Sequence, residues 1–437
     1  MSSPIRTPYS PASAFRGAGG ADLRAEVLVV GAGLIGAAAT LALAQAGLQV
    51  GWIAPAGAAG PAAAGPDTGA AVGPAVGPAV GPGSGPDFGS EAPWDSRIYA
   101  VSPGNIDWLS AIGAWDGVAQ DRTCDVVSMQ INGDDGEASL SFDTRTARQA
   151  RLAVICESSN LARGLEQALA AAGDRVMRIS GRVAALRVGE RAVSIALESG
   201  ASLRAPLVVA ADGADSAIRQ LAGIEAKTRG YEHTAVVANF RSALAHHGVA
   251  RQWFFGDSVL ALLPLPGDHC SLVWSCADAH ARFLLELPAP MLAAEVQRVT
   301  ASVTGALDPV TAAQGFALRL QQVDRLAMPR IALVGDAAHV VHPLAGQGMN
   351  LGLGDCRELA RVLAGRGPQP DVGDLGLLRR YQRARAEPIA ALRMATDGLF
   401  RLFASDRPGM ARLRNLGLGW VDRSAMLKRQ LVAAAIV

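Results

Sequence analysis

Residues 330–353, RIALVGDAAHVVHPLAGQGMNLGL, decide the fold of this chain. Their apolar run Ile331–Val334 stops at Gly335-Asp336, which is typical of a buried strand that ends in a sharp turn. Because α/β sheets bind ligands beyond the carboxyl ends of their strands, Asp336 is a candidate ligand-binding carboxylate. The glycines of Gly346-Gln347-Gly348 allow a ligand to approach the backbone, and the helix expected after them offers free N–H groups. An ordinary strand–loop–helix unit is the alternative.

A second pattern of this kind lies near the N-terminus. We expect a strand at Glu26–Val30, a helix at Ala37–Ala46 and a strand at Leu48–Ile53, which together form a βαβ unit. The intervening turn, Gly31-Ala32-Gly33-Leu34-Ile35-Gly36, fits the GxGxxG pattern, whose glycines permit the turn, the approach of a pyrophosphate and helix–strand packing. Hydropathy alone would also allow a membrane span here, but the βαβ pattern favours strands buried on both faces.

A third apolar run, Leu207–Ala210, also ends at an acidic residue followed by glycine, Asp212-Gly213. The pattern predicts another sheet strand that ends at a binding edge. Three separate stretches of the chain therefore carry residues suited to a ligand at the ends of strands.

These stretches resemble the motifs of the FAD-dependent aromatic hydroxylases, the p-hydroxybenzoate hydroxylase superfamily. GDAAHVVHPLAGQGMNLGLGD resembles the second FAD motif, Asp95–Ser102 resembles D-x-R-x-x-A-[LV]-S, and Asp212–Arg219 matches D-G-x-x-S-x-x-R. The resemblance implies that Asp336 bonds the ribityl chain and that the 346–350 loop lines the isoalloxazine ring. The FAD-binding residues that we expect are Gly31, Gly33, Gly36, Arg97, Arg163, Asp212, Gly335, Asp336, Pro343, Gly346, Gln347, Gly348, Met349 and Asn350.

Arg219 closes the third motif and implies a role toward NAD(P)H. By the resemblance it would offer charge to the phosphates of the nicotinamide cofactor, whereas a salt bridge on a helix surface is the alternative. His339 and His342 stand beside the flavin loop and could help to ionise a phenol, or they could be structural. No catalytic residue is therefore assigned.

The chain departs from the dinucleotide-binding pattern at Ala54. An acidic residue normally ends the second strand and bonds the adenosine ribose. Alanine cannot accept such a bond, so weaker FAD affinity is expected.

Residues 233–275 and the C-terminal tail resemble one subfamily, the ubiquinone-biosynthesis hydroxylases of the UbiH/UbiF type, and the likeness covers the chain from Glu26 onward apart from residues 55–93. It implies an FAD-dependent monooxygenase that hydroxylates a polyprenylated phenol with O₂ through a flavin C4a-hydroperoxide, with NAD(P)H or another electron donor. The alternatives are a hydroxylase of another phenol, a reductase of isoprenoid double bonds, and a non-catalytic FAD-binding subunit of a quinone-synthesis complex.

The expected fold class is α/β, or α+β overall, with a Rossmann-like FAD-binding domain, an antiparallel-sheet substrate domain and a C-terminal helical region. Trp253, Phe254, Phe255, Leu263, Pro264 and Trp274 of the substrate sheet could floor an apolar pocket, or each could belong to the ordinary hydrophobic core. The predicted ranges are a disordered leader (1–24), FAD-binding segments (25–125, 151–222 and 326–366) with a flexible insertion (55–93), substrate-domain segments (126–150 and 223–325) and the C-terminal region (367–437).

Composition limits the partners of this 437-residue chain. The net charge of +1 gives no reason to expect nucleic acid. The five cysteines show no CxxC pair or metal-ligand spacing, so we expect free thiols, no metal and a cytoplasmic location. Apolar and basic residues alternate between Arg412 and Lys428, which would suit peripheral docking to the inner membrane or to partner proteins, or an ordinary amphipathic helix pair.

Overall fold

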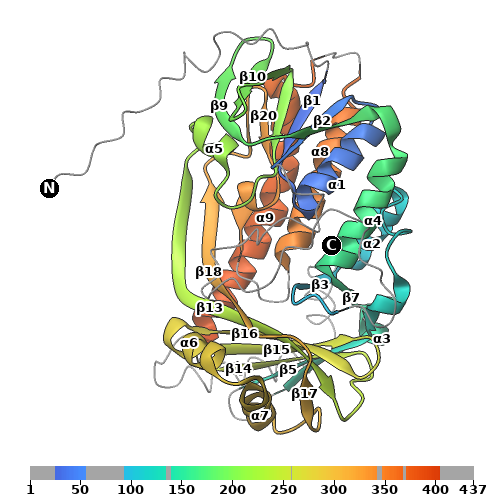
Figure 1. The fold of residues 1–437 in the computed structure, drawn as a ribbon, viewed down its shortest axis with the longest axis vertical. Coiled ribbons are helices and arrows are strands. Elements are labelled where there is room, and N and C mark those ends of the chain that lie inside the picture. The colour runs from blue at the N-terminus through green and yellow to red at the C-terminus, as the bar shows by residue number, and fades with distance from the viewer. Residues whose placement is uncertain are drawn as a thin grey trace, which may run out of the picture.

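A computed structural model describes residues 25–55, 93–133, 139–256, 258–341, 347–367 and 371–403. They form a unit built on a parallel sheet, stacked on a larger, mainly antiparallel sheet (Figure 1). The predicted fold class is confirmed. The predicted leader, most of the insertion and residues 404–437 lie outside the described residues, and the domain ranges remain a prediction.

The parallel sheet has the order β19-β20-β12-β1-β2-β8, with only β19 antiparallel to its neighbour. Every residue of β1, β12 and β20 is buried. Residues 27–54 therefore form a covered βαβ unit, and none of the described helices is long and apolar enough to cross a membrane. The strands are β1 (Val27–Val30), β2 (Val50–Ala54), β8 (Val176–Ser180), β12 (Leu207–Ala210), β19 (Ala327–Met328) and β20 (Ile331–Leu333).

Helices cover this sheet, and α1 lies at the centre of their packing, in contact with α4 and α8. Helix α9 packs against α8 and continues toward the larger sheet (Figure 1). The helices of this unit are α1 (Leu34–Gln45), α2 (Pro103–Ala111), α4 (Ser158–Ala171), α5 (Ala217–Leu221), α8 (Gln347–Ala364) and α9 (Leu375–Phe403).

Two small sheets complete this unit. The β3-β7-β4 sheet lies between the parallel sheet and the larger one, because Val126 and Ile155 pack against Ala250 and Leu265 of the larger sheet. The strands are β3 (Ile98–Val101), β4 (Thr123–Val126), β7 (Ala153–Glu157), β9 (Val183–Val188), β10 (Val193–Leu197) and β11 (Ser202–Ala205).

The larger sheet has the order β21-β18-β13-β16-β15-β14-β5-β6, with β17 beside β13. Strand β13 runs from the parallel-sheet unit into this sheet and so connects the two (Figure 1). The elements are β5 (Ser128–Asn132), β6 (Ser139–Asp143), α3 (Thr144–Ala147), β13 (Ala226–Ser242), β14 (Val249–Phe255), β15 (Ser258–Leu265), β16 (His269–Ala277), α6 (Asp278–Glu286), α7 (Ala289–Val299), β17 (Leu307–Pro309), β18 (Gln314–Val323) and β21 (His339–Val340).

The two faces of the larger sheet have different neighbours, and this corrects the predicted pocket floor. Trp253 and Trp274 belong to an outer core with Leu284 of α6 and Val296 of α7. Phe255 packs against the same core. Pro264 is next to the inner-face residue Leu263 in β15, so its side chain is on the outer face. Neither residue points toward the FAD-binding unit. Of the six expected residues, only Phe254 and Leu263 lie on the inner face. Sequence alternation identified the strands but could not say which face was inner.

Candidate FAD-binding site

Three predicted ligand-approach segments meet at one edge of the parallel sheet. Strands β20, β12 and β1 are neighbours in the sheet and run in the same direction, so their carboxyl ends lie side by side. These ends carry Gly335-Asp336, Asp212-Gly213 and Gly31 respectively. Such an edge is where parallel sheets bind nucleotide ligands.

Gly31 and Gly36 make the turn after β1 possible. Gly31 has φ +135°, and a Cβ there would lie 2.0 Å from the Ala211 carbonyl oxygen. A Cβ on Gly36 would lie 2.2 Å from the Gly31 carbonyl oxygen, so α1 can begin against the strand ends only with glycine at both positions. In the described structure α1 starts at N-cap Gly33 without a side-chain cap, which leaves its N-terminus suited to a phosphate.

The Gly335-Asp336 turn packs against the same end of α1. Gly335 has φ +60°, and a Cβ there would lie 2.9 Å from Ile35 Cγ2. Gly352 of α8 makes an equally close approach, since its Cβ would lie 2.8 Å from Ile35 Cδ1. The half-buried Asp336 is thus held beside the first turn of α1 and the first turns of α8.

Asp212 has one carboxylate oxygen in use and one without a partner. Its Oδ2 accepts a hydrogen bond from Ile218 N at 3.1 Å. Its Oδ1 is buried and has no hydrogen-bond partner among the described residues. Burial raises the pKa of this carboxyl group above its ordinary value. A ligand that donates a hydrogen bond here would satisfy the orphaned oxygen, so the site fits a polar cofactor.

The side chain of Asn350 forms hydrogen bonds within the protein instead of facing a ligand. Its Oδ1 accepts hydrogen bonds from Ser102 N at 2.9 Å and Asn105 Nδ2 at 3.0 Å, and its Nδ2 donates to Ala100 O at 2.7 Å. These bonds fasten β3 and the start of α2 to α8. Gln347, Gly348 and Met349 occupy the first turn of α8, while Pro343, Gly346 and His342 lie outside the described residues.

Comparison with known proteins identifies the family. The family model for an FAD binding domain matches residues 92–395. A ubiquinone hydroxylase, UbiL, of Rhodospirillum rubrum is 32% identical over 419 residues, which cover 96% of this chain and 91% of that protein. The 3-demethoxyubiquinol 3-hydroxylase of Escherichia coli is 31% identical, covering 94% of this chain and 98% of that one. The chain belongs to the ubiquinone-biosynthesis hydroxylases of the FAD-dependent monooxygenase superfamily.

Solved structures of a monooxygenase and of a protein in complex with FAD share the fold. The p-nitrophenol 4-monooxygenase PnpA of Pseudomonas putida superimposes with a TM-score of 0.70 at 18% identity, covering 94% of this chain and 98% of that one. HpxO of Klebsiella pneumoniae, solved in complex with FAD and uric acid, gives a TM-score of 0.67 at 18% identity, with coverage of 94% and 98%. The glycine turns and the orphaned Asp212 oxygen of this family member fit FAD.

The arginines expected near the cofactor have protein partners. Arg163 of α4 donates from Nε to Gly117 O at 3.0 Å. The backbone N–H of Arg97 donates to Asp95 Oδ1 at 2.9 Å, which places this half-buried residue just before β3. Contacts of either arginine with the flavin remain predictions.

The surface salt-bridge interpretation of Arg219 is wrong, whereas its role toward NAD(P)H remains a prediction. The residue is only 5% exposed, and its guanidinium donates to Ala337 O at 3.0 Å and Ala214 O at 2.8 Å. It therefore connects the Asp212 turn with the Asp336 turn instead of forming a surface salt bridge. The Arg219 side chain thus joins the Asp212-Gly213 and Gly335-Asp336 turns of this hydroxylase.

Sequence reasoning missed a buried cluster of Asp355, His339 and Arg385. Asp355 Oδ2 lies 2.7 Å from His339 Nε2, and Asp355 Oδ1 accepts from Arg385 Nε at 2.7 Å. His339 and Arg385 lower the pKa of Asp355 despite its complete burial. A signal was present, because Asp355 is four residues from both Leu351 and Leu359 on an apolar helix face. His339 is 3% exposed and bonded to Asp355, which supports its structural interpretation.

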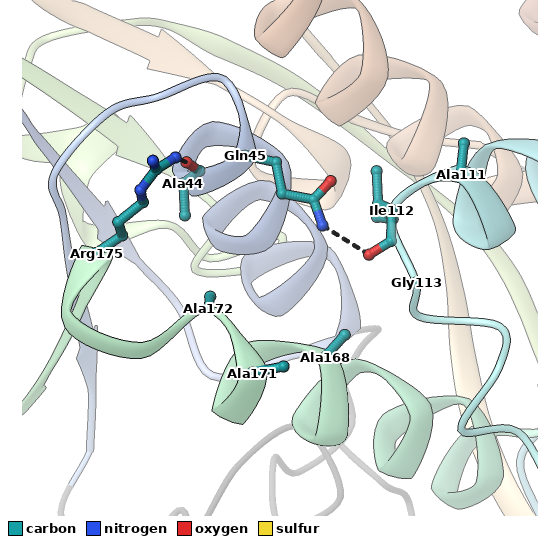
Figure 2. A pocket seen from close by; sticks show the side chains of 9 residues that line it. All are labelled: Ala44, Gln45, Ala111, Ile112, Gly113, Ala168, Ala171, Ala172 and Arg175. Carbon is teal, nitrogen blue, oxygen red and sulfur yellow. Dashed lines mark hydrogen bonds between the residues drawn. The ribbon is translucent and has the colours of Figure 1, made fainter.

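A surface pocket of about 460 Å³ lies away from the predicted cofactor site. It is lined by Ala44 and Gln45 at the C-terminal end of α1, together with α2, α4 and Arg175 (Figure 2). Gln45 and Arg175 donate to Ile112 O and Ala44 O there. The pocket is thus at the opposite end of α1 from the GxGxxG turn.

Within the described residues no group of three or more His, Cys, Asp or Glu side chains could hold a metal.

We predict that Ala54→Glu increases the affinity for FAD. Ala54 ends β2, and the preceding residue, Ile53, accepts a hydrogen bond from Gly31 N at 3.0 Å. A longer side chain at position 54 would therefore be close to the expected ribose. A charge-assisted acceptor should add roughly 1.5–3 kcal/mol, about one to two powers of ten in affinity. Fluorescence titration of the apoprotein with FAD measures the change, with Ala54→Gln as the uncharged control. Equal or weaker binding would show that another group already serves the ribose.

Proposed function

We propose that this chain hydroxylates the aromatic ring of a polyprenylated phenol in ubiquinone biosynthesis, with FAD as cofactor and O₂ as oxidant. The observation that carries the proposal is the glycine-lined edge where β1, β12 and β20 end, in a chain that matches ubiquinone hydroxylases over nearly its whole length. FAD, when bound, supplies the activation of O₂ for transfer to the ring. The protein must hold the ring in place and exclude water.

The inner face of the larger sheet supports an apolar substrate. Directly opposed residues of an antiparallel sheet share a face, as do residues two apart on one strand. By this register one face carries a strip of apolar side chains, several of them only half-buried: Phe254, Val259, Ala261, Leu263, Val273 and Phe316. Leu263 packs against the same buried cluster as Ala100, whose carbonyl accepts a hydrogen bond from Asn350 of α8, so the strip adjoins the expected flavin side.

The electron donor that we propose is NAD(P)H. Arg219, to which the family resemblance gives a role toward the phosphates of this donor, is buried and donates to two carbonyl groups. A prenylated substrate would come from a membrane, so we also propose that this chain associates peripherally with the inner membrane. The basic and apolar segment expected to dock there, Arg412–Lys428, lies outside the described residues.

Turnover with isotopic oxygen tests the reaction. Under ¹⁸O₂, the holoenzyme with NAD(P)H and a short-chain prenylated phenol should give a ring-hydroxylated product carrying one ¹⁸O atom. Equal turnover of phenols without the prenyl chain would favour a hydroxylase of another phenol. Bound FAD with no hydroxylated product from any phenol would favour the non-catalytic subunit.

We predict that Asp336→Ala abolishes retention of FAD. The variant removes the carboxylate expected to accept the ribityl hydrogen bond, with a loss of about 1.5–3 kcal/mol for such a bond. Flavin absorbance per mole of purified protein measures the effect, and Asp324→Ala, at an exposed aspartate paired only with Arg325 in the described structure, is the control. Full occupancy in Asp336→Ala would contradict this role.

A further inference from the structure

Helix α9 reaches the strand end that carries the Gly335-Asp336 turn. Tyr381 Oη, completely buried, donates to Leu333 O at 2.7 Å, and Leu333 is the last residue of β20. One helical turn later, Arg385 Nε donates to Asp355 Oδ1 at 2.7 Å. The two side chains lie on the same face of α9 because they are four residues apart.

Asp355 connects α9 to the Gly335-Asp336 turn. Its second oxygen, Oδ2, accepts from Gly335 N at 3.0 Å and lies 2.7 Å from His339 Nε2. α9 therefore holds the backbone on both sides of the strand-to-turn junction, through Tyr381 at Leu333 and through Arg385 and Asp355 at Gly335. The carboxylate is completely buried, so its partners cannot be replaced by water without rearrangement.

The fit around Arg385 is specific. Its Nη2 donates to Leu351 O at 2.9 Å, and a Cβ on Gly354 would lie 3.0 Å from the same nitrogen. A guanidinium can satisfy a carboxylate and a carbonyl at once, which a shorter or single-donor side chain cannot do. Gly354 thus leaves room for this one cation between α8 and α9.

We propose that α9 is part of the FAD site, with Tyr381 and Arg385 as positioning residues that set the place of the Gly335-Asp336 turn. Docking of α9 and binding of FAD are then coupled, and the coupling is reciprocal. FAD should protect α9 from local opening, and loss of the α9 contacts should weaken FAD binding. This inference rests on the proposed role of Asp336 toward the cofactor.

The test compares Arg385→Met with Arg383→Met, a matched change at an exposed position of the same helix. We expect the dissociation constant for FAD to rise by about tenfold or more in Arg385→Met, because a charge-assisted bond is lost, and to stay unchanged in Arg383→Met. Tyr381→Phe, which removes only the hydroxyl, should weaken binding by a smaller factor. Arg385→Lys should restore part of the affinity, since it keeps the charge.

A second measurement distinguishes a positioning role of Tyr381 and Arg385 from a role in the stability of the fold alone. Saturating FAD should slow tryptic cleavage and hydrogen exchange within residues 379–393 of the wild type, and this protection should be reduced in Tyr381→Phe. If Arg385→Met does not fold, Asp355→Asn/Arg385→Met, which buries no net charge, takes its place with the same expected loss of FAD affinity.

Four outcomes overturn the inference. Folded variants with lower melting temperature but wild-type FAD affinity would show that the cluster only stabilises the fold, and so would a wild type whose α9 gains no protection from FAD. A wild type that binds no FAD would overturn the proposed function together with this inference. Binding by the wild type with unchanged variants would overturn this inference alone.

Discussion

Gly31→Ala is expected to abolish FAD binding and to lower the free energy of unfolding by more than about 3 kcal/mol. The added Cβ would lie 2.0 Å from the Ala211 carbonyl oxygen and 2.5 Å from its carbon, which are backbone atoms of the neighbouring strand end. The φ of +135° is also unfavourable for alanine. Relief requires β1 and β12 to separate at the site where the pyrophosphate is expected. Urea unfolding and flavin content measure the two effects.

Gly47→Ala is the matched control for this prediction. Gly47 follows α1 with φ +87°, but no atom lies within 4 Å of the position its Cβ would take. This variant therefore isolates the backbone strain, about 1–2 kcal/mol, from the steric clash. If the two variants lose the same stability and Gly31→Ala keeps its flavin, the close approach of the two strand ends has no part in cofactor binding.

Arg122→Met is expected to destabilise the fold by about 3–5 kcal/mol, because it leaves a buried carboxylate without its cation. Arg122 and Glu157 are 3% and 0% exposed, and two bonds of 2.8 and 2.7 Å join them. Glu157 Oε1 also accepts from Asp95 N at 2.8 Å, so the ion pair fixes the segment before Arg97. The guanidinium further lies 3.9 Å from the Trp94 ring centroid. Urea unfolding measures the loss.

Arg151→Met provides the comparison at an exposed ion pair. Arg151 lies 3.0 Å from Asp125, and the two side chains are 39% and 49% exposed. Water screens such a pair, so the expected change is within about 1 kcal/mol. Similar small losses in both variants would mean that Glu157 takes up a proton or finds another partner when Arg122 is removed.

The sequence alone was sufficient for the elements whose signals are local. The strands before Gly31, Asp212 and Gly335 were predicted from short apolar runs that end at turn residues, and β1, β12 and β20 follow them closely. A strand of this kind must be buried on both faces, and glycine is required where two backbones nearly touch. Both requirements are visible within a few residues of chain, so the fold class and the candidate FAD edge could be recognised.

Contacts between distant segments were decided only by the tertiary structure. Alternation along residues 249–277 predicted strands, but whether Trp274 or Val273 faces the flavin side depends on which face the helices after residue 277 cover. The buried position of Arg219 could not be predicted, because nothing near it in sequence reveals its partner, the carbonyl of Ala337. Asp355 and Arg385 are 30 residues apart, and a buried charge is stable only if folding brings its counter-charge within hydrogen-bond distance. Periodicity shows which residues share a face, whereas the partner of that face is set by the packing of the whole chain.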